Sequence, residues 1–100
     1  MNNKFWGMLG LAMRAGKLQV GEGRAFGAIT SNEAKLILVA NDASANTAKK
    51  VSDKGSYRNI PIISPADRFQ MGAAVGKKIA VVMAVTEDGF AQQLLKLAEN

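Results

Sequence analysis

The chain contains no cysteine and no histidine. Their absence excludes disulfide bonds, thiolate nucleophiles, imidazole bases and the two commonest kinds of zinc ligand. No apolar run reaches the roughly 18 residues of a membrane-spanning helix, and residues 1–16 lack the uninterrupted apolar stretch of a secretory signal. We therefore expect a cytoplasmic protein that lacks the usual catalytic groups of most hydrolases and binds no metal or cofactor.

The composition that is present favours one packed domain over residues 1–100, because 48% of the residues are hydrophobic. The net charge is +5, and it is unevenly distributed. Residues 1–78 hold twelve Lys or Arg and five Asp or Glu, whereas residues 79–100 hold one basic and three acidic residues. Such a positive field suits a polyanion, but many mildly basic proteins bind no nucleic acid, so charge alone leaves the partner open.

Helical and strand patterns alternate along the chain. Apolar residues recur at helical spacing over residues 5–13, and Gly16 stands where a left-handed residue would end that helix. Four short apolar segments are typical of strands, at 18–20, 34–40, 60–63 and 79–85. Helices are expected between them and after the last. This alternation predicts an α/β fold, a three-layer α/β/α sandwich with the sheet between helical layers.

Several helix ends are predicted from capping residues. The third helix is expected to follow the oxygen-bearing side chains of residues 41–44 and to stop at Gly55. The fourth is expected to begin at Pro65, with Ser64 as its N-cap and an acid, Asp67, in its first turn.

Three junctions from a strand to a helix are candidate binding sites. The first runs through two glycines into a helix start at residues 20–24, where free N–H groups suit a phosphate or a base oxygen. The second follows the central strand at residues 40–44, and the third covers residues 63–66. Taken singly, each junction is also explained by turn formation or helix capping. If the sheet brings them to one edge, they form one surface.

A fourth cluster comprises Lys49, Lys50, Lys54 and Arg58, on and after the third predicted helix. Lys50 and Lys54 share a helix face. The cluster is either solvated surface or a track for an RNA backbone beyond the main site.

Four segments carry a resemblance to a known family: LGLAMRAGKLQVGEGR at 9–24, AKLILVANDASANTAKKVSDK at 34–54, MGAAVGKK at 71–78 and VVMAVTEDGFAQQL at 81–94. Over essentially its whole length, the chain resembles the kink-turn-binding ribosomal-protein family of archaeal and eukaryotic large subunits, and most of all its bacterial YlxQ-type branch. The resemblance implies a mixed four-stranded sheet and no enzymatic activity. It also implies structured RNA, ribosomal or otherwise associated with translation, as the partner, with ribosomal or translation proteins as further partners and no DNA or membrane.

The resemblance also assigns the RNA-binding residues. The start of the second helix would enter the widened groove of a kink turn, and the loop after the third strand would shield an unstacked base. The first element corresponds to Gly21, Glu22, Gly23, Arg24 and Gly27, the second to Ile63, Ser64, Pro65 and Ala66, and the flanking positions to Lys17, Asn41, Asp42, Ala43 and Ser44.

The sequence departs from the family pattern at the second helix. Archaeal members carry an Asn-Glu pair and a following Lys where this chain has Gly23, Arg24 and Gly27. The resemblance therefore implies that a cation, which can donate to guanine or hold a phosphate, replaces the family's carboxylate. The loss of polar side chains at the two glycines favours an alternative, a protein-interaction module of the translation or ribosome-assembly machinery with weak RNA affinity. A small phosphate-handling enzyme is a weaker alternative, resting on residues 21–24 alone.

Overall fold

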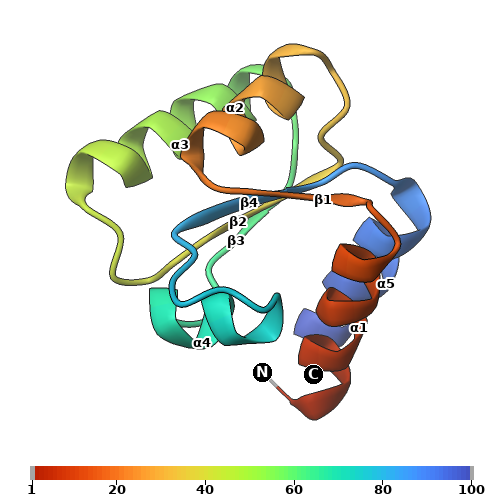
Figure 1. The fold of residues 1–100 in the computed structure, drawn as a ribbon. Helices are drawn as coiled ribbons and strands as arrows, with labels where there is room; N and C mark the ends of the chain where they lie inside the picture. Colours follow the sequence, from red (N-terminus) through yellow and green to blue (C-terminus); the bar gives the residue numbers. More distant parts are fainter. Residues whose placement is uncertain (1, 100) are drawn as a thin grey trace.

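Helices and strands alternate throughout the computed structural model, which describes residues 2–99 (Figure 1). The elements are α1 (Asn3–Arg14), β1 (Leu18–Val20), α2 (Glu22–Thr30), β2 (Leu36–Val39), α3 (Ala45–Tyr57), β3 (Ile62–Ile63), α4 (Arg68–Ala74), β4 (Val82–Val85) and α5 (Asp88–Ala98). The predicted order of elements is confirmed. The first predicted strand has the bounds of β1, whereas the other three were longer than the observed strands.

The four strands form one mixed sheet in the order β1-β4-β2-β3. Strand β4 is antiparallel to both of its neighbours, β1 and β2, whereas β2 and β3 are parallel. Strands β1, β2 and β3 therefore run in the same direction, and their carboxyl ends reach the same edge of the sheet, where β4 begins. We call this edge the strand-end edge.

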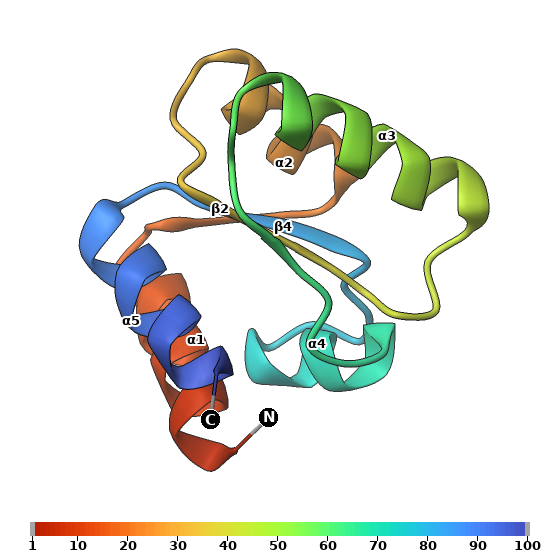
Figure 2. The same cartoon turned by 180° about the vertical axis from the view of Figure 1, so that it is seen from behind.

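Helices cover both faces of the sheet. Figures 1 and 2 show α2 and α3 on one face and α1, α4 and α5 on the other. Two separate apolar clusters fill the spaces between the layers, one beneath α2 and α3 and the other against α1, α4 and α5. The α/β/α sandwich is thus confirmed. None of the helices within residues 2–99 is both long and apolar enough to cross a membrane.

The helix starts differ in how they are capped. Side-chain oxygens of Asn2, Ser44, Asp67 and Glu87 accept hydrogen bonds from first-turn N–H groups of α1, α3, α4 and α5. Helix α2 instead begins after Gly21, whose φ of 107° favours glycine and which provides no side-chain cap. Among the helices of residues 2–99, α2 alone therefore leaves its first N–H groups without a side-chain partner.

The prediction that Gly55 ends the third helix is wrong. Helix α3 continues to Tyr57, and Gly55 is buried within it. A Cβ atom added at Gly55 would lie 2.6 Å from Cδ1 of Ile62 on β3. This glycine therefore permits close packing of α3 against the sheet, which outweighs its low helix propensity.

The predicted start of the fourth helix at Pro65 is also wrong. Helix α4 begins at Arg68, and Asp67 is its N-cap, with Oδ1 accepting from the N–H groups of Phe69 and Gln70 at 3.0 and 2.9 Å. The carbonyl of Ala66 accepts from the N–H of Asn41 at 2.8 Å. This bond joins the segment before α4 to the loop after β2. The segment therefore stays outside the helix.

Candidate functional site

The strand-end edge joins the three strand-to-helix loops to the segment that precedes β4. Besides the bond between Asn41 and Ala66, the N–H of Ala40 donates to the carbonyl of Val81 at 2.8 Å. The N–H of Ala80 donates to the carbonyl of Arg68 at 3.0 Å. The N–H of Gly21, in the loop after β1, donates to the carbonyl of Val82 at 2.9 Å. The three loops therefore share one edge, because each is hydrogen-bonded to a neighbouring segment there.

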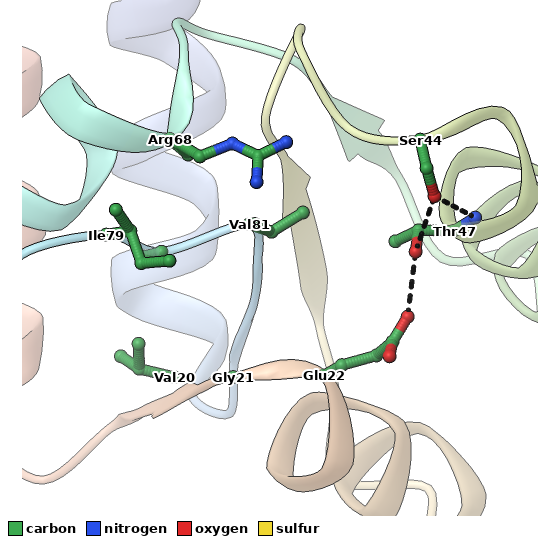
Figure 3. Close-up of a pocket in the computed structure, with 9 residues that line it drawn as sticks. Val20, Gly21, Glu22, Ser44, Thr47, Arg68, Ile79 and Val81 are labelled. Carbon is green, nitrogen blue, oxygen red and sulfur yellow. Dashed lines mark hydrogen bonds between the residues drawn. The ribbon is translucent and has the colours of Figure 1, made fainter.

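A pocket of about 340 Å³ opens at this edge (Figure 3). It is lined by Val20, Gly21, Glu22, Ser44, Thr47, Arg68, Ile79, Ala80 and Val81. On one side, the hydroxyl of Thr47 donates to Oε1 of Glu22 at 3.0 Å, and the hydroxyl of Ser44 donates to the Thr47 oxygen at 3.1 Å. These bonds link α2 to α3 and hold the carboxylate of Glu22 at the pocket.

On the other side of the pocket, Asp42 and Arg68 connect the loop after β2 to the start of α4. Oδ1 of Asp42 accepts from the backbone N–H of Arg68 at 3.0 Å, and Oδ2 accepts from Nε at 3.1 Å. Nη2 of Arg68 also donates to the backbone carbonyl of Asp42 at 2.8 Å. Both side chains are partly exposed, so the pair fixes the relative position of the two loops more than it adds to stability.

The start of α2 presents backbone rather than side chains to solvent. The N–H groups of Glu22, Gly23 and Arg24 precede the first intrahelical hydrogen bond, from Ala25 to Gly21. A Cβ atom added at Gly23 or Gly27 would meet nothing within 4 Å. These donors, at the positive end of the helix dipole, can therefore receive an anion or a base oxygen.

Three free cations belong to the segments that form or lead to this edge: Arg24 at the start of α2, and Lys77 and Lys78 between α4 and β4. All three are exposed, and none forms an ion pair with the residues that the structure describes. Arg68, by contrast, is already paired with Asp42. Within residues 2–99 no group of three or more acidic, His or Cys residues could hold a metal ion.

The third predicted segment is at the edge but only partly on the surface. Ser64 is exposed and Pro65 is half-buried. Ala66 is 8% exposed and belongs, with half-buried Ile63, to the cluster against α1, α4 and α5. A contact between this loop and a base would therefore involve Ser64 and Pro65 rather than the side chain of Ala66.

Lys17, predicted to flank the site, lies apart from the other predicted residues. The carbonyl of Lys17 accepts from the N–H of Thr86, which follows β4. The residue therefore lies before the first residue of β1, at the edge of the sheet opposite the strand-end edge. Lys17 precedes β1 and Gly21 follows it, so the two residues lie at opposite ends of this strand.

Several residues of the edge were missed by the sequence analysis. Thr47 and Arg68 were read as helix interior, and residues 79–81 as strand. Phe69 and Ile79, 62% and 49% exposed, form apolar surface next to Arg68.

The fold is an α/β/α sandwich, and this edge is its candidate ligand surface, built from loops and an uncapped helix start. The family model described as the Ribosomal protein L7Ae/L30e/S12e/Gadd45 family matches residues 3–95. The chain belongs to this family.

Two curated relatives match almost the full chain. A protein named RNA-binding protein YlxQ from Bacillus subtilis (strain 168) is 45% identical over 92 residues, 92% of each chain. A protein of the same name from Enterococcus faecium is 41% identical over 97 residues, 97% of this chain and 93% of the relative. Neither name denotes an enzyme, in agreement with the non-enzymatic class expected from the sequence.

Two solved structures share the fold. A Bacillus halodurans protein of unknown function superposes with a TM-score of 0.94 at 33% identity, covering 99% of this chain and all of the other. The Giardia lamblia 15.5kD RNA binding protein superposes with a TM-score of 0.81, covering 99% of this chain and 88% of the other. At 12% identity the second likeness concerns the fold alone.

Proposed function

We propose that this protein binds structured RNA of the kink-turn type, without enzymatic activity, and forms a ribonucleoprotein with ribosomal or translation-associated RNA in the cytoplasm. The observation that carries the proposal is the uncapped start of α2 at the strand-end edge, where three N–H groups lie beside exposed Arg24. The names of the two curated relatives support RNA as the partner. The resemblance to kink-turn binders supports the finer class of RNA.

In the proposed complex, the start of α2 enters a groove of the RNA. Its N–H groups and Arg24 donate to phosphates or base edges, whereas Glu22 accepts from base N–H groups through Oε2, since Oε1 already bonds to Thr47. Lys77 and Lys78 hold the backbone beyond the groove. The site would read the shape of a folded RNA, because backbone donors at a helix start discriminate bases poorly.

The experiment is crosslinking in cells followed by sequencing of the attached RNA, for the parent and two variants. Gly23→Glu adds an acid to the first turn of α2, which favours the helix but repels phosphates. Gly7→Glu adds the same charge to α1, on the other face of the sheet, where a Cβ atom also meets nothing within 4 Å. We expect a specific set of RNAs with the parent and Gly7→Glu, and its loss with Gly23→Glu.

If crosslinking of the parent protein recovers only background RNA, the proposal is contradicted. The alternative, a protein-interaction module of the translation or ribosome-assembly machinery, would then take its place. The apolar surface of Phe69 and Ile79 favours that alternative, because exposed aromatic and aliphatic side chains are typical anchors of protein interfaces.

A further inference from the structure

One side of α3 carries cations and an aromatic ring in one stripe, in which Lys50 and Tyr57 are exposed and Lys54 and Arg58 are half-buried. Lys50, Lys54 and Tyr57 are spaced by four and three residues, so they lie on the same side of the helix, and Arg58 follows at its end. Tyr57 is 81% exposed, the largest value among the exposed large hydrophobic residues of the described chain. We call these four residues the α3 stripe.

Contacts with neighbouring elements hold two of the cations in place. Nζ of Lys54 lies 5.4 Å from the ring centroid of Phe26 on α2, and Cζ of Arg58 lies 5.4 Å from that of Tyr57. Nε of Arg58 also donates to Oδ1 of Asn32 at 3.3 Å. The guanidinium and the phenol ring therefore form one surface of fixed arrangement at the carboxyl end of α3.

A polar hollow of about 280 Å³ continues from this surface. Arg58 and Lys35 provide its cations and Asp88 its acidic side chain, with the remainder of the lining contributed by Asn32, Ala34, Asn59, Ile60 and Pro61. The hollow extends the positive surface of the α3 stripe across the end of the sheet.

Helix stability explains only part of this arrangement. Cations in the last turn favour the helix dipole, which accounts for Lys54 and Arg58. Lys49, to one side of the stripe, is neutralised by Asp53 at 3.0 Å. Neither argument explains Tyr57, whose ring adds nothing to the core and has modest helix propensity.

An exposed aromatic ring flanked by cations is the arrangement that binds unpaired nucleotides, because bases stack on the ring and the cations attract the backbone. Building on the proposed function, we propose that the α3 stripe is a second RNA contact, which binds a single-stranded segment adjoining the structured RNA held at the strand-end edge. Helix α3 starts at that edge and its 13 residues span about 20 Å. The two contacts are therefore separate, and one RNA reaches both only if it extends past its folded part.

The test is a titration of the ¹⁵N-labelled full chain, followed by amide chemical shifts, with two probes. The first is a single-stranded oligouridine of about 12 nucleotides, a length within the range that single-strand-binding folds occupy. The second is a kink-turn hairpin without overhangs. We expect the oligouridine to shift the amides of Tyr57, Arg58 and Asn32, and the hairpin to shift those of residues 21–27.

The two probes separate the two proposals. If the oligouridine leaves the amides of Tyr57, Arg58 and Asn32 unmoved, or moves only residues of the strand-end edge, the α3 stripe is not an RNA contact, whatever the hairpin does. If instead the hairpin shifts no amide resonance, the proposed function is contradicted. The shifts caused by oligouridine then still test whether the α3 stripe binds RNA.

Variants at Tyr57 test the stacking directly. Tyr57→Ala should weaken oligouridine binding about tenfold, whereas Tyr57→Phe, which retains the ring, should bind like the parent. Both should keep the melting temperature of the parent, because the side chain is exposed. Equal affinities of the alanine variant and the parent would overturn the stacking role.

Discussion

The first two turns of α2 contain two glycines and a cation that does not stabilise the helix. Arg24 lies at the positive end of the helix dipole, where a positive charge is unfavourable. Gly23 and Gly27 are exposed, with open space around them. This segment therefore has a lower helix stability than one without the glycines and the cation, but it has an open backbone and a donor side chain. The proposed RNA contact explains this combination.

Restoring the family pattern tests this explanation. The variant Gly23→Asn, Arg24→Glu, Gly27→Lys should raise the affinity for a standard kink turn at least about tenfold, since a good bidentate base contact contributes about 1 to 3 kcal/mol. Replacing glycine within the helix should also stabilise the fold by up to about 1 kcal/mol per site. Fluorescence anisotropy for binding and urea unfolding for stability measure the two effects separately.

An unkinked duplex of matched length is the control for that variant. Its affinity should change less, because the restored side chains contact base edges and not only phosphates. If the variant folds normally but binds neither RNA better than the parent, α2 does not enter a kink turn in the family's orientation.

At the scale of elements, the loops at the strand-end edge are positioned by hydrogen bonds between segments far apart in sequence. Asp42 and Arg68 are 26 residues apart, as are Asn32 and Arg58 at the opposite edge. The pairing of strands brings such segments together. The order of strands in the sheet therefore places the three loops at one edge.

The link between Asp42 and Arg68 gives a prediction at this scale. Asp42→Ala removes the acceptor of two hydrogen bonds at the start of α4. It should lower the free energy of unfolding by about 1 kcal/mol, discounted for the partial exposure of the pair. Asp42→Asn, which retains the acceptor for the backbone N–H, should lose less. Urea unfolding measures both.

Hydrogen exchange of the Arg68 amide locates that effect. Exchange should accelerate in Asp42→Ala and change little in Asp42→Asn. A protected Arg68 amide together with unchanged stability in Asp42→Ala would contradict the view that this pair holds the two loops together.

The sequence predicted the elements well where local chemistry decides them. Ser44 caps α3 as expected, and Gly16 adopts the left-handed conformation after α1. It failed where tertiary packing decides. Pro65 resembled a helix start, yet a long-range bond keeps its loop extended, and Gly55 resembled a stop, yet packing against Ile62 retains it in α3.

The candidate site was predictable to a similar extent. The glycine-rich start of α2 was visible in the sequence, because strand, glycines and helix are adjacent. Lys17 lies apart from it at the far edge, because it precedes β1. Thr47 and Arg68 were missed because only the fold brings their side chains to the pocket.

For the whole molecule, the sheet separates two apolar layers and its two edges carry different surfaces. The strand-end edge has an uncapped helix start, the free cation Arg24 and a pocket. The excess of positive charge in residues 1–78 is shared between this edge and the hollow beside the α3 stripe, which contains Lys35 and Arg58. A folded polyanion is the ligand that this distribution of charge and backbone donors suits.

The most direct measurement is the affinity of the parent protein for a kink-turn hairpin and for a straight duplex of equal length, determined by anisotropy over a series of salt concentrations. We predict tighter binding of the kink turn, by about tenfold or about 1.4 kcal/mol. We also predict a steep loss of affinity with salt, corresponding to about three to six phosphate contacts. Equal affinity for the two RNAs, or affinity that does not depend on salt, would contradict the proposal that the strand-end edge binds structured RNA.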